Sequence, residues 1–150
     1  SCVELEASGQ RVVLDLGLPL DAESNNPHLL PAIQGVDGND PSLLGILISH
    51  PHLDHYGLLA HVSNRVKIGL GASARRILQA ASDFVPGDWP LPAPGWDYES
   101  GKTFAIGHFR VTPYLVDHSA YDAYALLIEA DGKRLFYSGD FRGHGRKSAG

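Results

Sequence analysis

The sequence has one cysteine, no methionine, and no apolar run of the roughly 20 residues that a membrane-spanning helix needs. Because Cys2 is alone, no disulfide can form within the chain, which favours a cytoplasmic setting. The first residues lack the pattern of a secretory signal peptide, and we expect no membrane partner. Positive charge is not in excess either. The net charge of −5 does not by itself predict a nucleic-acid-binding protein, although bound metal cations would reverse the sign locally.

The length and composition are sufficient for one domain. A chain of 150 residues that is 43% hydrophobic and 19% charged is typical of a soluble globular domain with its own core. Residue 1 opens directly into a strand pattern, methionine is missing, and Gly150 falls in a glycine-rich segment. We therefore expect residues 1–150 to be one domain and a fragment of a longer chain, whose remainder would be a partner of this domain.

Strand and helix patterns alternate along the chain. We expect hairpins at 2–6 with 11–15 and at 123–129 with 134–137, further strands at 43–49 and 65–70, and paired strands at 103–106 and 109–116. Helices are expected at 57–62 and at 73–81, the second with Ser73 as its N-cap. These elements predict an α/β sandwich.

Two segments rich in proline and glycine are expected to be loops. The first, residues 16–42, is predicted to hold a short helix around 27–34, and loops of this length tend to be functional. The second, residues 82–102, is expected to be irregular, with Trp89, Trp96 and Tyr98 anchoring it on the core.

The two predicted hairpins resemble each other. Residues 6–13 are similar to residues 129–136, and the second strand of each hairpin leads to an acidic residue, Asp15 or Asp140. Hairpins with glycine turns look alike in any case, and a fold built from two similar halves would give the same pattern.

A dense cluster of possible metal ligands follows the apolar segment 43–49. His50, His52, Asp54 and His55 fall within six positions, and imidazole and carboxylate groups are ligands that Zn²⁺ takes in catalytic sites. Alternation along an extended segment puts His50 and His52 on one side. Asp54 and His55 would face a neighbouring point as the chain turns. Two pairs with different directions predict two adjacent metal ions, and the alternative is a solvated, histidine-rich loop.

Two later residues are candidates to complete such a site. His118 follows the predicted strand 109–116, and Asp140 follows the strand 134–137 through Ser138-Gly139. A carboxylate at Asp140 could bridge two ions, which lie roughly 3.5–4 Å apart in two-metal sites. The expected ligands are His50, His52 and His118 for one ion and Asp54 and His55 for the other, with Asp140 shared.

The spacing His50-x-His52-x-Asp54-His55, followed by His118 and by Gly139-Asp140, resembles the metallo-β-lactamase fold superfamily. The resemblance covers nearly the whole chain and implies an αββα sandwich, incomplete in this chain. Asp15 in Leu14-Asp15-Leu16-Gly17 matches the first motif of the family. Its implied role is to hydrogen-bond a ligand or the ligand loop, outside the ligand set itself.

Within that superfamily, residues 118–122 and Gly139-Asp140-Phe141 look most like the ribonuclease J-like branch, in which two-zinc nucleases hydrolyse phosphodiesters. Many members of that branch carry a second domain after the Gly-Asp motif. A further histidine that completes their second metal site would lie beyond residue 150. We expect His144 to be a surface or substrate-side residue, not that ligand.

Other polar residues receive simpler interpretations. His28, His61 and His108 are expected to lie outside the site. The basic residues after Asp140, which are Arg142, Arg146 and Lys147, are expected either to bind phosphate oxygens beside the metals or to form a solvated basic loop.

The leading hypothesis is a dinuclear zinc-dependent hydrolase, namely a phosphodiesterase or ribonuclease acting on RNA. The two Zn²⁺ ions would lower the pKa of a bound water, and Asp54 would accept a proton from the attacking water. One alternative is a metal-dependent hydrolase of small esters, thioesters or lactams. The net negative charge of the chain slightly favours this alternative over an RNA substrate. The other is a non-catalytic metal-binding domain.

Overall fold

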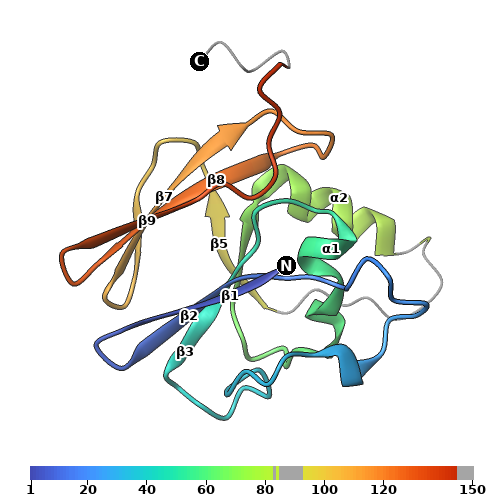
Figure 1. Ribbon diagram of the computed structural model, residues 1–150, viewed down its shortest axis with the longest axis horizontal. Helices are drawn as coiled ribbons and strands as arrows, with labels where there is room; N and C mark the ends of the chain where they lie inside the picture. The colour runs from blue at the N-terminus through green and yellow to red at the C-terminus, as the bar shows by residue number, and fades with distance from the viewer. Residues whose placement is uncertain (83, 85–92, 145–150) are drawn as a thin grey trace.

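Two β-sheets stack face to face in the computed structural model, which describes residues 1–82, 84 and 93–144 (Figure 1). The first sheet contains β1 (Cys2–Ala7), β2 (Gln10–Leu16), β3 (Leu43–Leu47), β4 (Ile68–Gly71) and β5 (Pro94–Tyr98), in that order. The second contains β6 (Phe104–Ile106), β7 (Phe109–Val116), β8 (Ala123–Ala130) and β9 (Lys133–Tyr137), also in order.

The pairing of the strands places Asp15 and the histidine segment at one edge of the first sheet. β1 is antiparallel to β2, whereas β2, β3, β4 and β5 run parallel to one another. The carboxyl ends of parallel strands meet at the same edge of a sheet. Asp15 near the end of β2 and the histidine segment after β3 are therefore neighbours. The second sheet is antiparallel throughout.

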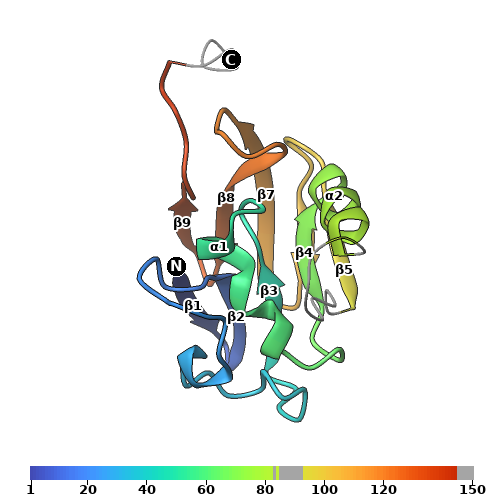
Figure 2. The ribbon, with the colours of Figure 1, turned by 90° about the vertical axis from the view of Figure 1, so that its right-hand side faces the viewer.

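Helices cover the first sheet (Figure 2). They are the 3₁₀ helix η1 (Pro27–Leu29), α1 (Leu53–Tyr56), the 3₁₀ helix η2 (Gly57–His61) and α2 (Ala72–Ser82). None of the described helices is long and apolar enough to cross a membrane. Among the described helices, α1 and η2 pack against β2, and α2 packs against β4. The predicted α/β sandwich is confirmed, with one helical layer on its first sheet.

Two apolar cores hold the three layers together. One lies between the helices and the first sheet and includes Val13, Ile46, Ile48, Leu58, Leu59, Ile68, Leu70 and Ala74. The other lies between the sheets and includes Val12, Leu14, Leu47, Tyr98, Phe109, Val111, Leu126 and Ile128. Leu14 and Leu126 are both fully buried, and burial of such a side chain contributes roughly 1.5–3 kcal/mol.

Asp15 interrupts the alternation of β2. Leu14 packs between the sheets, but Leu16 packs on the helical side of the first sheet. Residues two apart in a regular strand share a face. The left-handed backbone of Asp15, with a φ of 56°, breaks this rule and turns its carboxylate into the interior.

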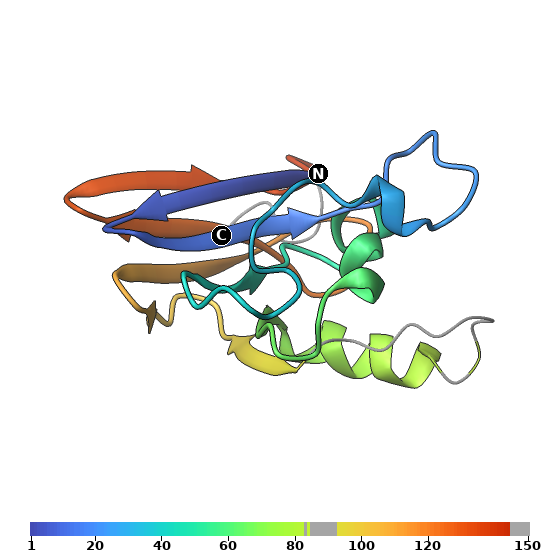
Figure 3. The same cartoon turned by 90° about the horizontal axis from the view of Figure 1, so that it is seen from below.

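The two hairpins predicted to be alike are alike in structure. Both turns have positive φ at their two central residues, Ser8 (51°) and Gly9 (74°) in one and Asp131 (49°) and Gly132 (72°) in the other, as a type I′ turn requires. The Ser8 hydroxyl donates to the Asp131 carboxylate over 3.1 Å. The two turns therefore meet at one end of the sandwich (Figure 3).

Several boundaries differ from the sequence prediction. Residues 94–98 form β5, so the prediction of an irregular loop over 82–102 is wrong there; Trp96 and Tyr98 do pack on the core, but from a strand. Trp89 lies outside the described residues. The helix expected at 57–62 is a 3₁₀ helix preceded by α1. The strand expected at 65–70 begins only at Ile68.

Ser73 does not cap the helix that follows β4. α2 begins at Ala72, so Ser73 is already inside it. The carboxylate of Asp122, from the loop before β8, accepts hydrogen bonds from the main-chain N–H groups of Ser73 and Ala74, both at 2.9 Å. Asp122 therefore supplies the capping acceptor that the sequence prediction gave to Ser73.

Candidate metal centre

The segment from the end of β3 through α1 carries four of the six predicted ligands. β3 ends at Leu47, the chain continues without regular structure, and α1 begins at Leu53. His50 lies in the irregular part and is fully buried, whereas Asp54 and His55 lie on the first turn of α1. The main-chain N–H of Leu18 donates to the carbonyl of Leu53 over 2.9 Å, which fixes α1 against the segment after β2.

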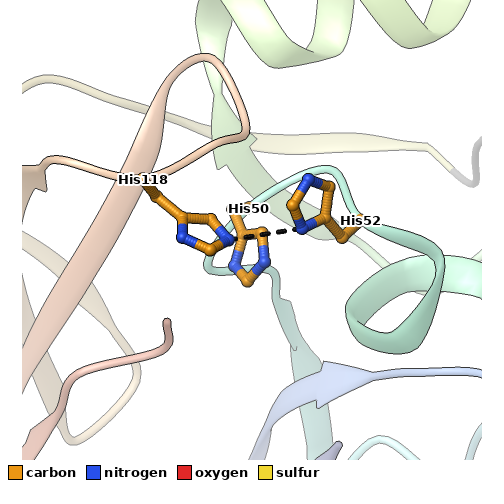
Figure 4. Close-up of side chains that lie close together, drawn as sticks. All are labelled: His50, His52 and His118. Carbon is orange, nitrogen blue, oxygen red and sulfur yellow. Dashed lines mark hydrogen bonds between the residues drawn. The ribbon is translucent and has the colours of Figure 1, made fainter. Parts of the chain in front are cut away.

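Three histidines converge in what we call the first donor set: His50, His52 and His118 (Figure 4). One ligand atom from each lies within 4.8 Å of the others. Nε2 of His118 is 3.3 Å from Nδ1 of His52. His118 follows β7 in the second sheet, and the structure brings it to the His50–His52 pair, where the sequence analysis expected it.

The donor atoms of this set fit a metal ion. Nε2 of His50 is buried and has no hydrogen-bond partner within the described part of the chain. Leaving a buried polar atom unpaired costs about 1–3 kcal/mol. A cation among the three rings would satisfy His50 and would also separate the facing nitrogens of His52 and His118. Three imidazole nitrogens are a familiar ligand set for Zn²⁺.

A second donor set consists of His50, His55 and Asp140, again with ligand atoms within 4.8 Å of one another. Nε2 of His55 lies 3.4 Å from Oδ2 of Asp54 and 3.6 Å from Oδ2 of Asp140. The structure therefore brings all six predicted ligands to one place. His50 is common to both sets, whereas the sequence prediction gave the shared position to Asp140.

Asp15 holds the ligand segment in place through hydrogen bonds to Ser49 and His55. Its fully buried carboxylate accepts a hydrogen bond from the main-chain N–H of Ser49 at Oδ1 (2.7 Å). Oδ2 receives the Ser49 hydroxyl (2.8 Å), Nδ1 of His55 (2.7 Å) and the Tyr137 hydroxyl (2.6 Å). A proton on Nδ1 of His55 leaves its Nε2 free to bind a cation, as in the carboxylate–histidine–metal arrangement.

The pKa values of the histidines in this centre are shifted in different directions. Burial, with the neighbouring His55 and His118, lowers the pKa of His50 to about 4. Burial also lowers the pKa of His118, assisted by His52 and by the positive charge of Arg142. For His55 burial acts in the same direction, but the hydrogen bond and charge of Asp15 outweigh it and raise the pKa. His50 and His118 are therefore neutral, as metal ligands must be.

Other predicted residues lie apart from the donor sets. His61 bonds to the Asn25 side chain, and His28 and His108 are exposed. His144 is exposed and belongs to neither set. The main-chain N–H of Arg142 donates to the carbonyl of Asp117 over 2.7 Å. This bond ties the segment after Asp140 to the loop that carries His118. Arg146 and Lys147 lie outside the described residues.

Sequence reasoning missed two residues of this centre. Ser49 bonds to Asp15 through both its main chain and its hydroxyl, and its Oγ is 3.0 Å from Nδ1 of His50. Tyr137 reaches Asp15 from the second sheet. Ser49 could have been found from its place directly before the first histidine. No local signal marks Tyr137, because its partner is 122 positions away.

Comparison with known proteins assigns the fold to a family. The family model for the beta-lactamase superfamily domain matches residues 11–148. The chain belongs to this superfamily. The metallo-β-lactamase resemblance seen in the sequence is thereby confirmed, and members of the superfamily are typically hydrolases.

Individual relatives are distant and longer than this chain. Ribonuclease J of Mycoplasma pneumoniae is 21% identical over 144 residues, which are 92% of this chain and 25% of that protein. A protein of unknown function from Enterococcus faecalis has a TM-score of 0.77 at 20% identity, over 99% of this chain and 42% of that one. Zn²⁺-bound PqqB from Methylobacterium extorquens has a TM-score of 0.60 at 16% identity, over 91% of this chain and 47% of that one. The chain thus spans about a quarter of the curated relative.

Proposed function

We propose that residues 1–150 form a metallo-β-lactamase-like domain of a dinuclear zinc-dependent hydrolase that cleaves phosphodiester bonds in RNA. The observation that carries this proposal is the convergence of six donor residues from both sheets at one point. The similarity to ribonuclease J supports RNA as the substrate. Because the chain spans a quarter of that relative, the activity is proposed for the whole protein that contains it.

The residues divide into two ligand groups and their supports. His50, His52 and His118 would hold one Zn²⁺, and Asp54 and His55 would hold the other. Asp140 would be shared, because a carboxylate has two oxygens, whereas His50 would bind the first ion only although it lies in both donor sets. The ions would lower the pKa of a bound water and polarise the scissile phosphate. Asp15 holds His55 in the orientation that exposes Nε2.

Two further side chains of this centre have proposed roles. The partly exposed carboxylate of Asp54 would accept a proton from the attacking water, since general-base catalysis needs a group within hydrogen-bond reach of that proton. Burial is the main cause of the lowered pKa of His118, and the positive charge of the exposed Arg142 adds a smaller contribution in the same direction. Arg142 is therefore placed to bind a non-bridging phosphate oxygen.

The test combines metal analysis with an RNA cleavage assay on the purified protein. We expect about two zinc ions per chain and RNA cleavage that a chelator abolishes and added zinc restores. Asp54→Ala and His118→Ala should each lower the rate on the order of 10²-fold or more. His108→Ala, at an exposed turn histidine, is the matched control and should leave the rate unchanged.

The outcomes separate the proposal from its competitors. Full RNA cleavage by Asp54→Ala would refute the proposed mechanism. Intact RNA together with zinc-dependent cleavage of small esters, thioesters or lactams would replace the substrate class. A protein that takes up no zinc and cleaves neither kind of substrate would be a non-catalytic domain.

A further inference from the structure

The buried carboxylate of Asp15 is bound from both sheets. Ser49 and His55 belong to the ligand segment that follows β3, so their bonds to Asp15 join neighbours at one edge of the first sheet. Tyr137 is the last residue of β9 in the second sheet, and its hydroxyl donates to Oδ2 over 2.6 Å. Among the described residues it is the donor that reaches Asp15 from the opposite sheet.

The side chain of Tyr137 is suited to hold a fixed position. Its ring packs on the core between the two sheets, and a tyrosine has only two rotatable bonds, so little freedom is lost on ordering. Burial and the charge of Asp15 raise the pKa of Tyr137, which keeps the hydroxyl protonated as a donor. The strand that carries it leads within three residues to Asp140 of the second donor set.

Asp15 needs such an external contact. Its backbone has a φ of 56°, and a non-glycine residue in that region is held there by its surroundings. The carboxyl plane can still rotate about its last bond. Three donors converge on Oδ2 from different directions, and together they fix the plane.

We propose that Tyr137 is a positioning residue of the metal centre: by fixing Oδ2 of Asp15 it holds the Nδ1–H of His55 and so directs Nε2 of His55 toward Asp54 and Asp140. The proposed effect on zinc binding rests on the proposed metal centre. The proposed effect on the orientation of His55 rests only on the hydrogen bonds of Asp15 to His55 and Tyr137. Its consequence concerns the second donor set more than the first, because His52 and His118 make no bond to Asp15.

The test uses Tyr137→Phe, which removes the hydroxyl and keeps the ring. Tyr114→Phe is the matched control, because Tyr114 lies on β7 of the same sheet and is exposed. The first readout is the tautomer of His55 in the metal-free protein, measured by nitrogen NMR on histidine-labelled protein at alkaline pH. The second readout is a zinc titration that resolves the two binding steps.

In the wild type and in Tyr114→Phe we expect the Nδ1–H tautomer of His55. In Tyr137→Phe we expect a mixture of tautomers and a weaker second zinc step by 10- to 100-fold, the usual effect of losing a residue that supports a metal ligand. The first zinc step should change less than the second. A purely structural role for Tyr137 would lower the melting temperature without altering the tautomer.

An unchanged His55 tautomer in Tyr137→Phe would overturn the inference, as would two zinc steps identical to those of the wild type. If the wild type binds no zinc, the proposed metal centre fails, and the tautomer measurement still decides the role of Tyr137. The failure of the inference and the failure of the proposed function therefore give different results.

Discussion

Gly17 lies directly against the main-chain carbonyl of Asp54, and a methyl group on Gly17 would overlap that carbonyl. The chain leaving β2 and the first turn of α1 thus touch through backbone atoms, with no side chain between them. The bond from the N–H of Leu18 to the carbonyl of Leu53 lies beside this contact. The position of Asp54 and His55 depends on the absence of a side chain at residue 17.

We therefore expect Gly17→Ala to displace α1 and to weaken zinc binding at the second donor set. Overpacking of this kind costs typically 1–3 kcal/mol of folding stability. Thermal unfolding and zinc content are the measurements. Gly143→Ala is the control, since no described atom beyond its chain neighbours lies within 4 Å of a methyl group there. Unaltered zinc content and stability in Gly17→Ala would contradict the prediction.

Asp15→Asn should remove charge from the buried network while keeping its shape. An amide cannot accept from all the donors that converge on Asp15, so at least one buried donor loses its partner, at about 1–3 kcal/mol. We expect a lower free energy of unfolding and fewer zinc ions per chain. Asp131→Asn is the control, because Asp131 also has a positive φ but lies in an exposed turn. Equal effects of the two substitutions would argue against a special role for Asp15.

Asp122→Ala should destabilise α2 without touching the donor sets. It removes the acceptor of the N–H groups of Ser73 and Ala74, and loss of an N-terminal cap costs roughly 0.5–2 kcal/mol. Alanine is also less suited than aspartate to the φ of 65° at this position. Chemical denaturation measures the effect. Asp122→Asn keeps an acceptor oxygen and should retain most of the stability; an equal loss in both variants would exclude capping as the cause.

The metal-free protein should show opposite pH effects at two histidines. The pKa of His50 is lowered from 6.5 to about 4, so protons bind the unfolded chain more tightly, and this residue reduces stability as the pH falls from 6.5 towards 4. The raised pKa of His55 contributes stability that is present below 6.5 and is lost as the pH rises through its folded value.

Histidine NMR titration and denaturation at a series of pH values measure these two effects. His50 should remain neutral until the solution is well below its ordinary pKa, and His55 should titrate above it. A His50 signal that titrates near 6.5 in the metal-free protein would contradict the prediction.

The features that the sequence predicted well depend on residues adjacent in the chain. The turn at Asp131-Gly132 adopts the type I′ conformation that its dipeptide favours. The donors from His50 to His55 follow a buried strand, as the apolar run before them indicates. Local patterns thus predicted the hairpins and the place of the ligand segment.

The features that the sequence did not predict depend on distant partners or on exceptions to local rules. β5 begins at Pro94, and proline is tolerated at the first residue of an edge strand, which a composition-based prediction of a loop ignores. The cap of α2 comes from Asp122, 49 residues after Ser73. The bond between Tyr137 and Asp15 spans 122 positions and exists only because the two sheets are stacked.

The origin of the donors has a thermodynamic consequence. His50 and His52 follow a strand of the first sheet, whereas His118 and Asp140 follow strands of the second. A zinc ion shared between them would crosslink the sheets at one end of the sandwich, opposite the contact between Ser8 and Asp131. Metal release and sheet separation would then be linked equilibria. Each tenfold increase of free zinc above its dissociation constant would add about 1.4 kcal/mol to the free energy of unfolding.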